Sequence, residues 1–583
     1  MYDLIIKNGM LIDGTGSERY QADIGVKDGQ IAKIGILAEA DSEAIIDAKG
    51  QFVTPGFIDM HSHADVSIFM QPDAENLIGQ GVTSAFTGHC GMGMTPLDKY
   101  WTLMHVEGPA YEEMMPFSTI GHFPGEYPAI DVPTLKAGMK KCFGINMSWK
   151  TFGEYQRYLR EQGVAVNLFM IAGHSNMRQN AMGLHAERPA TEAELLEMEY
   201  WVKEAMEAGA FGISYGLDYT PGWDADDEEL LRLAECLKPY DGILTAHVQM
   251  RNHRHGKTVE DHRTLDGVKE LMEIGLKTGV HVHVSHIEAA DELDDEKAIY
   301  ESEKETLKLI EVYRKKGVRA TWDVSVPNLY AMYYFSDLSK VLLYYVTSCG
   351  GKKAFGERLK SEGYREYLAE CINRNENIVF PRWNDQAVIG RCACKEWEGK
   401  RICDIAEALE TDSAHALIEI LARDPETRYI QPIAPSLAKP QSERFYEAKE
   451  ACIGTDNMAT NYDFEGDVED MPKDNGTPSG FCGIIEYINS RLERGYKLET
   501  VVGQLTGNAA KVLGLTKRGY LKEGMQADIV IADLENLKPN KNMVDPRSKP
   551  EGISYVLVNG KVAMEHGNHS HVRSGMIERY ADR

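Results

Sequence analysis

Two histidines separated by one residue stand near the start of the chain, in the segment Gly56-Phe-Ile-Asp-Met-His61-Ser-His63. The apolar residues before them are typical of a buried β-strand, in which alternate side chains point the same way. His61 and His63 therefore present two imidazoles on one side of a strand end, and neutral imidazole is a common ligand of zinc and similar ions. Two structural histidines would give the same spacing, but the preceding Pro55-Gly56 and apolar run favour a metal site.

Four more residues of metal-binding type follow short apolar runs. They are Cys90, His247, His286 and Asp456. Taken singly, a thiol is more often a small buried apolar residue, a histidine is more often structural, and an aspartate is more often a helix N-cap. Their joint position matters more, because each falls at the carboxyl end of a predicted strand. That end of a parallel barrel is where catalytic residues gather.

The middle of the chain alternates such strands with helical periods, and the helices are expected at 191–208, 226–237 and 265–278, among others. The predicted strands are Phe57–Met60, Val82–Thr87, Val164–Ile171, Ala210–Ser214, Ile243–Ala246, Val280–Ser285, Arg319–Trp322 and Cys452–Gly454. Eight alternations predict an α/β fold of the (β/α)₈ TIM-like barrel type over residues 55–516. An open doubly wound sheet is the alternative, but no GxGxxG follows a strand.

Both ends of the chain read as short strands with Asp-Gly and Asn-Gly turns. We expect residues 1–54 and 517–583 to form one composite β-sandwich, although two unrelated β-caps would show the same pattern.

Two segments are longer than the connections of a minimal barrel. Residues 92–151 are expected to form a lid or loop over the site, and an insertion at about 324–450 carries its own helices.

The composition of the chain argues against several classes of binding partner. The 583 residues carry a formal net charge of -27 without a basic block, which argues against nucleic acid and an anionic membrane surface as partners. Ten cysteines are too few for a disulfide scaffold. The sequence shows neither a signal peptide nor an apolar run of membrane-spanning length. A cytoplasmic protein is expected, with a small-molecule partner, and a homo-oligomer is permitted.

Outside the insertion, the chain resembles the amidohydrolase superfamily, and within it the N-acyl-D-amino-acid deacylase (D-aminoacylase) family. The resemblance lies in sequence motifs. They are Pro55-Gly-Phe-Ile-Asp-Met-His-Ser-His63, Gly88-His-Cys-Gly91, Trp149-Lys-Thr-Phe-Gly-Glu-Tyr155, Gly173-His174 with Arg178 and Met182-Gly183, Gly209-Ala-Phe-Gly-Ile-Ser-Tyr-Gly-Leu-Asp-Tyr219, and Leu505-Thr-Gly-Asn-Ala-Ala-Lys-Val-Leu-Gly-Leu515.

The resemblance implies one or two zinc ions, with His61 and His63 at one position, His247 and His286 at the other, and Cys90 as ligand or bridge. It implies Asp456 as the catalytic carboxylate that moves the proton while activated water cleaves a linear amide, such as an N-acyl-D-amino acid or a related N-acyl or D-peptide substrate. A cyclic amide hydrolase of the dihydropyrimidinase or hydantoinase kind is the alternative. It needs a carbamylated lysine as bridge, for which Lys150 is the candidate by spacing.

The substrate-binding residues depart from the family pattern. Relatives carry Lys two residues after the histidine of strand six, where this chain has Glu288, and their His-Pro-Arg-x-x-Gly element appears here as Met471-Pro-Lys473-Asp-Asn-Gly476. Lys473 keeps the charge of that Arg but not its bidentate geometry. Tyr219 or His174 is expected to help to stabilise the oxyanion, although both suit structural roles equally well. These departures put the carboxylate group of the substrate in doubt.

Overall fold

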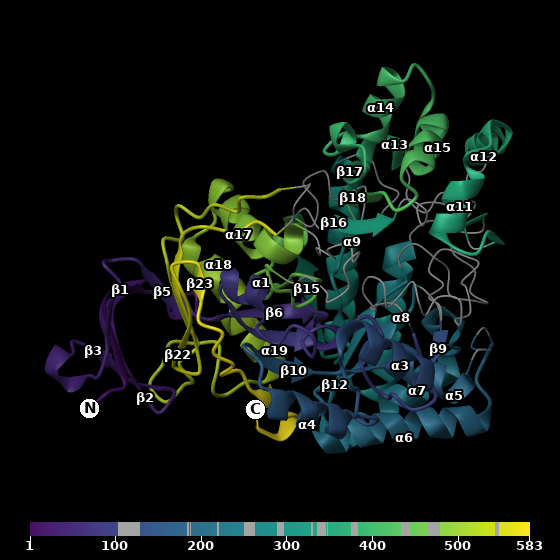
Figure 1. Cartoon of the computed structure of the whole chain (residues 1–583). Coiled ribbons are helices and arrows are strands. Elements are labelled where there is room, and N and C mark those ends of the chain that lie inside the picture. The colour runs from purple at the N-terminus through teal and green to yellow at the C-terminus, as the bar shows by residue number, and fades with distance from the viewer. Residues whose placement is uncertain are drawn as a thin grey trace.

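The structure is a computed structural model of the whole chain (Figure 1). The residues that it describes are 1–102, 129–183, 186, 188–218, 221–249, 263–288, 296–327, 330–334, 345–346, 348–374, 383–432, 443–463, 478–542 and 547–582. Of the expected site residues, Tyr219 and Lys473 lie outside these ranges. Among the described residues no helix has the length and apolarity that a membrane span requires.

Strands from both ends of the chain form one sheet, and Figure 1 shows the purple N-terminal strands beside the yellow C-terminal ones. Within the described residues its nine strands are β1 (Leu4–Leu11), β2 (Tyr20–Lys27), β3 (Gln30–Gly35), β4 (Ile45–Asp47), β5 (Phe52–Pro55), β20 (Ile529–Ala532), β21 (Ile553–Val558), β22 (Lys561–Glu565) and β23 (Asn568–His569). The antiparallel pair β5–β20 joins the two halves. Apolar side chains from both halves, such as Ile6 and Ile529, pack into one core.

The central strands are short, parallel and buried. They are β6 (Phe57–Ser62), β7 (Val82–Thr87), β10 (Asn167–Met170) with β11 (Ala172–Gly173), β12 (Gly212–Gly216), β13 (Ile243–His247), β14 (His281–Val284), β15 (Ala320–Ser325) and β19 (Cys452–Gly454). Each of the eight predicted runs overlaps one of these strands, and β11 follows directly after the third predicted run. Their apolar, β-branched composition suits strands that are covered on both faces.

The first and last central strands lie side by side. The Asp456 N–H donates to the His61 carbonyl at 2.8 Å, and the His63 N–H donates to the Asn457 carbonyl at 2.9 Å. Because all these strands run the same way, their carboxyl ends gather at one edge. The side chains that follow β6 and β19 are therefore brought together although they are almost 400 residues apart in sequence: the His63–Asp456 pair has a separation of 393.

Helices alternate with these strands and cover them. They are α1 (Glu75–Gly79), α3 (Val132–Phe143), α4 (Phe152–Gln162), α5 (His174–Met182), α6 (Glu192–Ala208), α7 (Asp227–Glu235), α8 (Arg263–Thr278), α9 (Glu296–Lys315), α17 (Pro478–Glu493), α18 (Leu498–Leu505) and α19 (Gly507–Leu513). Local sequence sets their ends. At α6 the Thr191 N–H donates to Glu194 Oε2 at 2.7 Å, and Gly209 ends the helix with φ of 104°.

Most of the segment between β15 and β19 forms a structure with its own core, whereas Phe445 and Tyr446 near its end pack into the main core. It contains β16 (Tyr330–Tyr334), α11 (Lys352–Arg358), α12 (Glu362–Arg374), α13 (Trp383–Gln386), β17 (Val388–Arg391), α14 (Ile402–Ala408), α15 (Ser413–Arg423), β18 (Arg428–Pro432) and α16 (Glu443–Glu447). Phe355, Leu417 and Tyr429 belong to a hydrophobic cluster that is separate from the main core. Most of this segment stands above the parallel strands in Figure 1. In the segment predicted as a lid, β8 (Tyr100–Thr102) pairs with β9 (Ala129–Asp131).

A buried ion network ties the C-terminal segment to both sheets. Arg518 is 3% exposed and donates to Asp528, to Asn559 Oδ1 at 2.8 Å and to Glu578 Oε1 at 2.7 Å. Glu578 belongs to β24 (Ile577–Glu578), which pairs in parallel with β10. The chain end therefore leaves the composite sheet and adds a strand to the parallel sheet that β6, β7 and β10 form.

Replacing Arg518 by methionine is expected to lower the free energy of unfolding by about 3–5 kcal/mol, because it leaves the buried Asp528 carboxylate without its cation. Urea unfolding of the purified variant measures this. The control is Arg19→Met, which removes a partly exposed pair with Glu499 and should cost at most about 1 kcal/mol. Equal losses in the two variants would contradict the role of the network.

Candidate metal centre

His61 in β6 and His63 directly after it point toward the end of β19. His61 Nε2 lies 3.3 Å from Asp456 Oδ1, and His63 Nε2 lies 3.1 Å from the same oxygen. The other ring nitrogen of His61, Nδ1, lies 3.2 Å from Asp323 Oδ1. A proton on Nδ1 leaves the Nε2 lone pair directed at the cluster, as a metal ligand requires.

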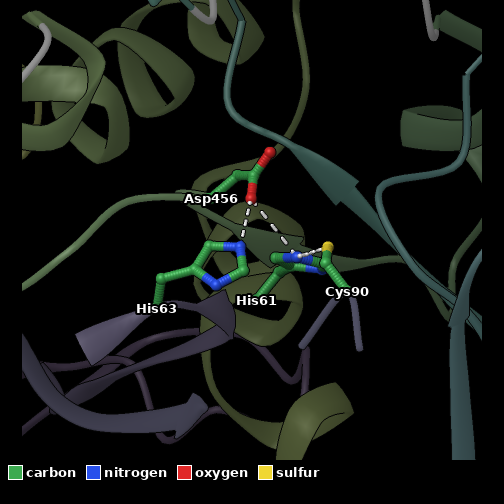
Figure 2. A group of neighbouring side chains, drawn as sticks. All are labelled: His61, His63, Cys90 and Asp456. Atoms are coloured by element: carbon green, nitrogen blue, oxygen red, sulfur yellow. Dashed lines mark hydrogen bonds and ion pairs between the residues drawn. The ribbon is translucent and has the colours of Figure 1, made fainter. Parts of the chain in front are cut away.

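Cys90 stands between two groups of histidines. Its Sγ lies 3.3 Å from His61 Nε2 and 3.4 Å from His286 Nε2. The donor atoms of His61, His63, Cys90 and Asp456 all lie within 4.8 Å of one another, and so do those of Cys90, His247 and His286. Figure 2 shows the first group, with the thiol beside the His61 ring and Asp456 above both imidazoles. The thiol is thus shared by both groups.

Three residues of the cluster adopt a left-handed backbone conformation. The φ angles are 59° at Cys90, 32° at His286 and 52° at Asp456. Such angles are uncommon for residues with a Cβ and collect at functional sites, where surrounding structure holds them. Each one turns the chain sharply after a strand, which directs the side chain over the strand ends. Close packing is required too: a Cβ on Gly454 would lie 2.2 Å from the His61 Cβ.

The cluster concentrates buried charge. Burial alone would raise the pKa of the Cys90 thiol, but His61, His286 and His247 outweigh it and hold that pKa well below its usual range. Burial would likewise raise the pKa of Asp456, and His61 and His63 hold it well below the usual range. Burial lowers the pKa of His63, yet Asp456 and Cys90 raise it to about 10. The thiol, the carboxylate and the imidazoles of the cluster therefore favour one another's charged forms.

These donors fit a zinc ion. Zinc binds imidazole nitrogen, thiolate sulfur and carboxylate oxygen at about 2.0–2.3 Å, so tetrahedral ligand atoms stand about 3.4 Å apart. The separations of 3.1–3.4 Å between neighbouring donor atoms match this spacing. A cation of charge two would pair with the Cys90 thiolate and the Asp456 carboxylate, and its ligand histidines would be neutral.

Three other residues considered from the sequence lie in different surroundings. His174 begins α5 and is buried, with Nε2 at 2.7 Å from Glu229 Oε1. Glu288 is 9% exposed and lies two residues beyond His286. Lys150 is half exposed and pairs with Asp98 at 2.8 Å. A half-exposed lysine that pairs with Asp98 does not supply a bridge between the buried donors at the strand ends, so Lys150 does not support the cyclic-amidase alternative.

Sequence reasoning missed Asp323, His283 and His89. Asp323 is fully buried in β15 and accepts from His283 Nε2 at 2.8 Å and from the His286 N–H at 2.9 Å. His89 stacks against His61, with ring centroids 4.0 Å apart. A signal was present in Ala-Thr-Trp-Asp-Val, because a carboxylate in the middle of a buried strand needs hydrogen-bonding partners.

The sequence matches the model of the Amidohydrolase family over residues 44–310 and 487–564. This match covers more than half of the chain, and it includes the HxH strand and the strands that carry Cys90, His247 and His286. The chain belongs to the Amidohydrolase family.

Several individual proteins are similar to this chain over nearly its whole length. The chain is 27% identical over 565 residues to a D-aminoacylase of Alcaligenes xylosoxydans xylosoxydans, covering 96% of this chain and 94% of that protein. A D-aminoacylase crystal structure superposes with a TM-score of 0.70 at 23% identity, covering 99% of both chains. An N-acyl-D-glutamate deacylase of Bordetella bronchiseptica, in complex with zinc and a phosphonate inhibitor, gives 0.69 at 24% identity over 99% of both chains. An L-hydantoinase of Arthrobacter aurescens is less similar, at 0.52 and 15% identity over 99% of both.

Proposed function

We propose that this protein is a metal-dependent hydrolase of linear amides, with an N-acyl-D-amino acid or a related N-acyl or D-peptide compound as substrate. The observation that carries the proposal is the position of Cys90 between the two histidine groups. A cysteine in that position, with Lys150 on the surface, suits the deacylase branch better than the cyclic amidases. The similarity to D-aminoacylase over nearly the whole chain supports the same choice.

In this proposal His61 and His63 would hold one zinc ion, His247 and His286 would hold a second, and Cys90 would supply a thiolate ligand. The supporting geometry is the pair of donor groups that share the thiol. When bound, zinc lowers the pKa of a water molecule and polarises the amide carbonyl. The chain supplies the rest of the chemistry through its carboxylates and hydrogen-bond donors.

Asp456 moves the proton. Its Oδ1 faces His61 and His63, while its second oxygen points away from both rings (Figure 2). That oxygen accepts a proton as water adds to the carbonyl carbon, and then delivers it to the nitrogen of the leaving amine as the C–N bond breaks. Such general acid–base transfer contributes roughly 10²–10⁴-fold to the rate.

The proposal also covers how the chain divides into domains. Residues 55–516 form a closed (β/α)₈ barrel with the insertion at about 324–450, and residues 1–54 with 517–583 form a β-sandwich. The hydrogen bonds between the ends of β6 and β19 and the composite sheet support this division. Within 517–583, β24 is the exception to this division, because it pairs in parallel with β10 and not with the composite sheet.

Glu288 is the proposed determinant of the substrate's charge. It stands where relatives carry a lysine, and a carboxylate there favours a neutral or cationic group. Replacing it by lysine is expected to lower KM for an N-acetyl-D-amino acid by about tenfold, or about 1.4 kcal/mol. Steady-state kinetics with the acid and its amide measure this, and the amide should show little change. An unchanged KM for the acid would show that Glu288 does not face the substrate.

Lys473, Tyr219 and His174 stay predicted contacts of substrate or oxyanion.

A hydrolysis screen tests the function. Zinc-loaded protein is supplied with N-acetyl and N-formyl amino acids of both hands, with dipeptides that contain a D-residue, and with hydantoin and dihydrouracil. We expect release of amine from the linear D-compounds and loss of that activity after chelation. Ring opening without cleavage of a linear amide would overturn the proposal in favour of a cyclic amidase.

A further inference from the structure

We propose that Asp323 is the positioning residue that fixes one histidine in each of the two metal-binding groups. The inference rests on the proposed metal centre and extends it to a buried carboxylate that is itself no part of the proposed ligand set. Asp323 lies in β15, fully buried, between β14 and β19. These neighbouring strands lead to His286 and to Asp456 respectively.

The two carboxylate oxygens of Asp323 have different partners. Oδ1 accepts the His286 N–H at 2.9 Å and lies 3.2 Å from His61 Nδ1. Oδ2 accepts from His283 Nε2 at 2.8 Å. One carboxylate therefore restrains the ring of His61 in the first group and the backbone of His286 in the second. Partners of this kind fix the tautomer and orientation of a metal-binding imidazole and increase its basicity.

The hydrogen bond from His286 to Asp323 stabilises a backbone conformation that is rarely adopted. His286 adopts a φ of 32°, which residues with a Cβ rarely adopt. Its amide donates to the Asp323 side chain, and the next amide, of Ile287, donates to the Asp323 carbonyl at 2.9 Å. Two consecutive hydrogen bonds to one residue hold the turn that directs His286 toward Cys90.

Further hydrogen bonds hold Asp323 in turn. His283 Nδ1 lies 2.8 Å from Thr321 Oγ1, and the same hydroxyl lies 2.8 Å from His281 Nε2. The chain Thr321–His283–Asp323–His61 thus runs from the body of the sheet to the metal-binding nitrogen. Because His283 donates to Asp323 from Nε2, the carboxylate cannot rotate without losing a bond in the protein interior, where that loss costs about 1–3 kcal/mol.

Asp323→Asn tests the proposal. In either orientation of the amide, its NH₂ group replaces an oxygen that accepts a hydrogen bond and meets an N–H group instead. The expected result is a roughly 10–100-fold weaker affinity for Zn²⁺, measured by competition with a chromophoric chelator. We also expect an altered Co²⁺ absorption spectrum, which reports ligand geometry. Neither readout depends on a substrate, so a failed amide screen would leave this test intact.

Asp528→Asn is the matched control, because it neutralises another buried carboxylate, the partner of Arg518. It should lower the melting temperature and leave Zn²⁺ affinity and the Co²⁺ spectrum as in the unmodified protein. A Zn²⁺ affinity of Asp323→Asn within twofold of the unmodified protein would overturn the proposal. If that variant does not fold, Asp323→Glu keeps the charge and should restore folding with intermediate affinity. Failure of both variants to fold would assign Asp323 to folding alone and reject the positioning role.

Discussion

Cys90→Ala is expected to lower kcat/KM for linear amides at least about 100-fold and to reduce bound zinc. Loss of a ligand should exceed the 10–100-fold cost of losing a ligand's partner. The physical reason is the place of the thiol, 3.3 Å from His61 Nε2 and 3.4 Å from His286 Nε2. Steady-state kinetics and metal analysis of the dialysed variant measure both effects.

Lys150→Ala is the matched control for this prediction. Lys150 pairs with Asp98 at the surface, so its removal should change kcat/KM by less than about twofold. The two variants separate the competing functions, because a cyclic amidase with a carbamylated lysine would show the reverse pattern. An active Cys90→Ala enzyme beside an inactive Lys150→Ala enzyme would therefore exclude the proposed metal centre.

Asp456→Asn is expected to lower kcat by about 10²–10⁴-fold, because the amide cannot accept the proton from water. The histidines and Cys90 remain, so zinc content should fall much less than activity. KM for the substrate should stay within a few-fold, since the variant keeps the shape of the side chain. Single-turnover kinetics combined with metal analysis separate the chemical step from metal binding.

Asp98→Asn removes a partly exposed carboxylate of the same type and serves as the control for the Asp456 variant. Its kcat should match that of the unmodified protein. Should Asp456→Asn lose zinc in proportion to activity, the carboxylate would be a ligand and nothing more. The proton transfer would then have to be assigned to another group.

The sequence alone was sufficient to locate the central strands and most of the donor-type residues that the structure brings together. A buried parallel strand is a short apolar run, and a ligand at its carboxyl end is displaced from that run by one or two residues, so His61, His247 and Asp456 could be found by position. The end of α6 was equally clear, because Thr191, Glu194 and Gly209 act locally on the backbone. These features depend on neighbours in sequence.

Other features depend on partners that are distant in sequence. Asp323 is important because of His61 and His283, which are 262 and 40 residues away. The exclusion of Lys150 rests on its exposure and its pair with Asp98, which spacing from the HxH motif cannot reveal. The pairing of β24 with β10 was missed because two residues of a strand carry no periodic pattern.

The composite sheet constrains how this chain is made in the cell. The hydrogen bond from Ile34 to Glu523 joins residues 489 positions apart, and β5 has to find β20 across a similar distance. At about 5–20 residues per second, the ribosome delivers the second half of that sheet roughly 25–100 s after the first. During this interval the N-terminal strands expose the apolar face that later packs against Ile529. Nascent chains therefore expose the apolar face of the N-terminal strands, which favours aggregation, for most of their synthesis. Chaperone binding to these strands would protect them.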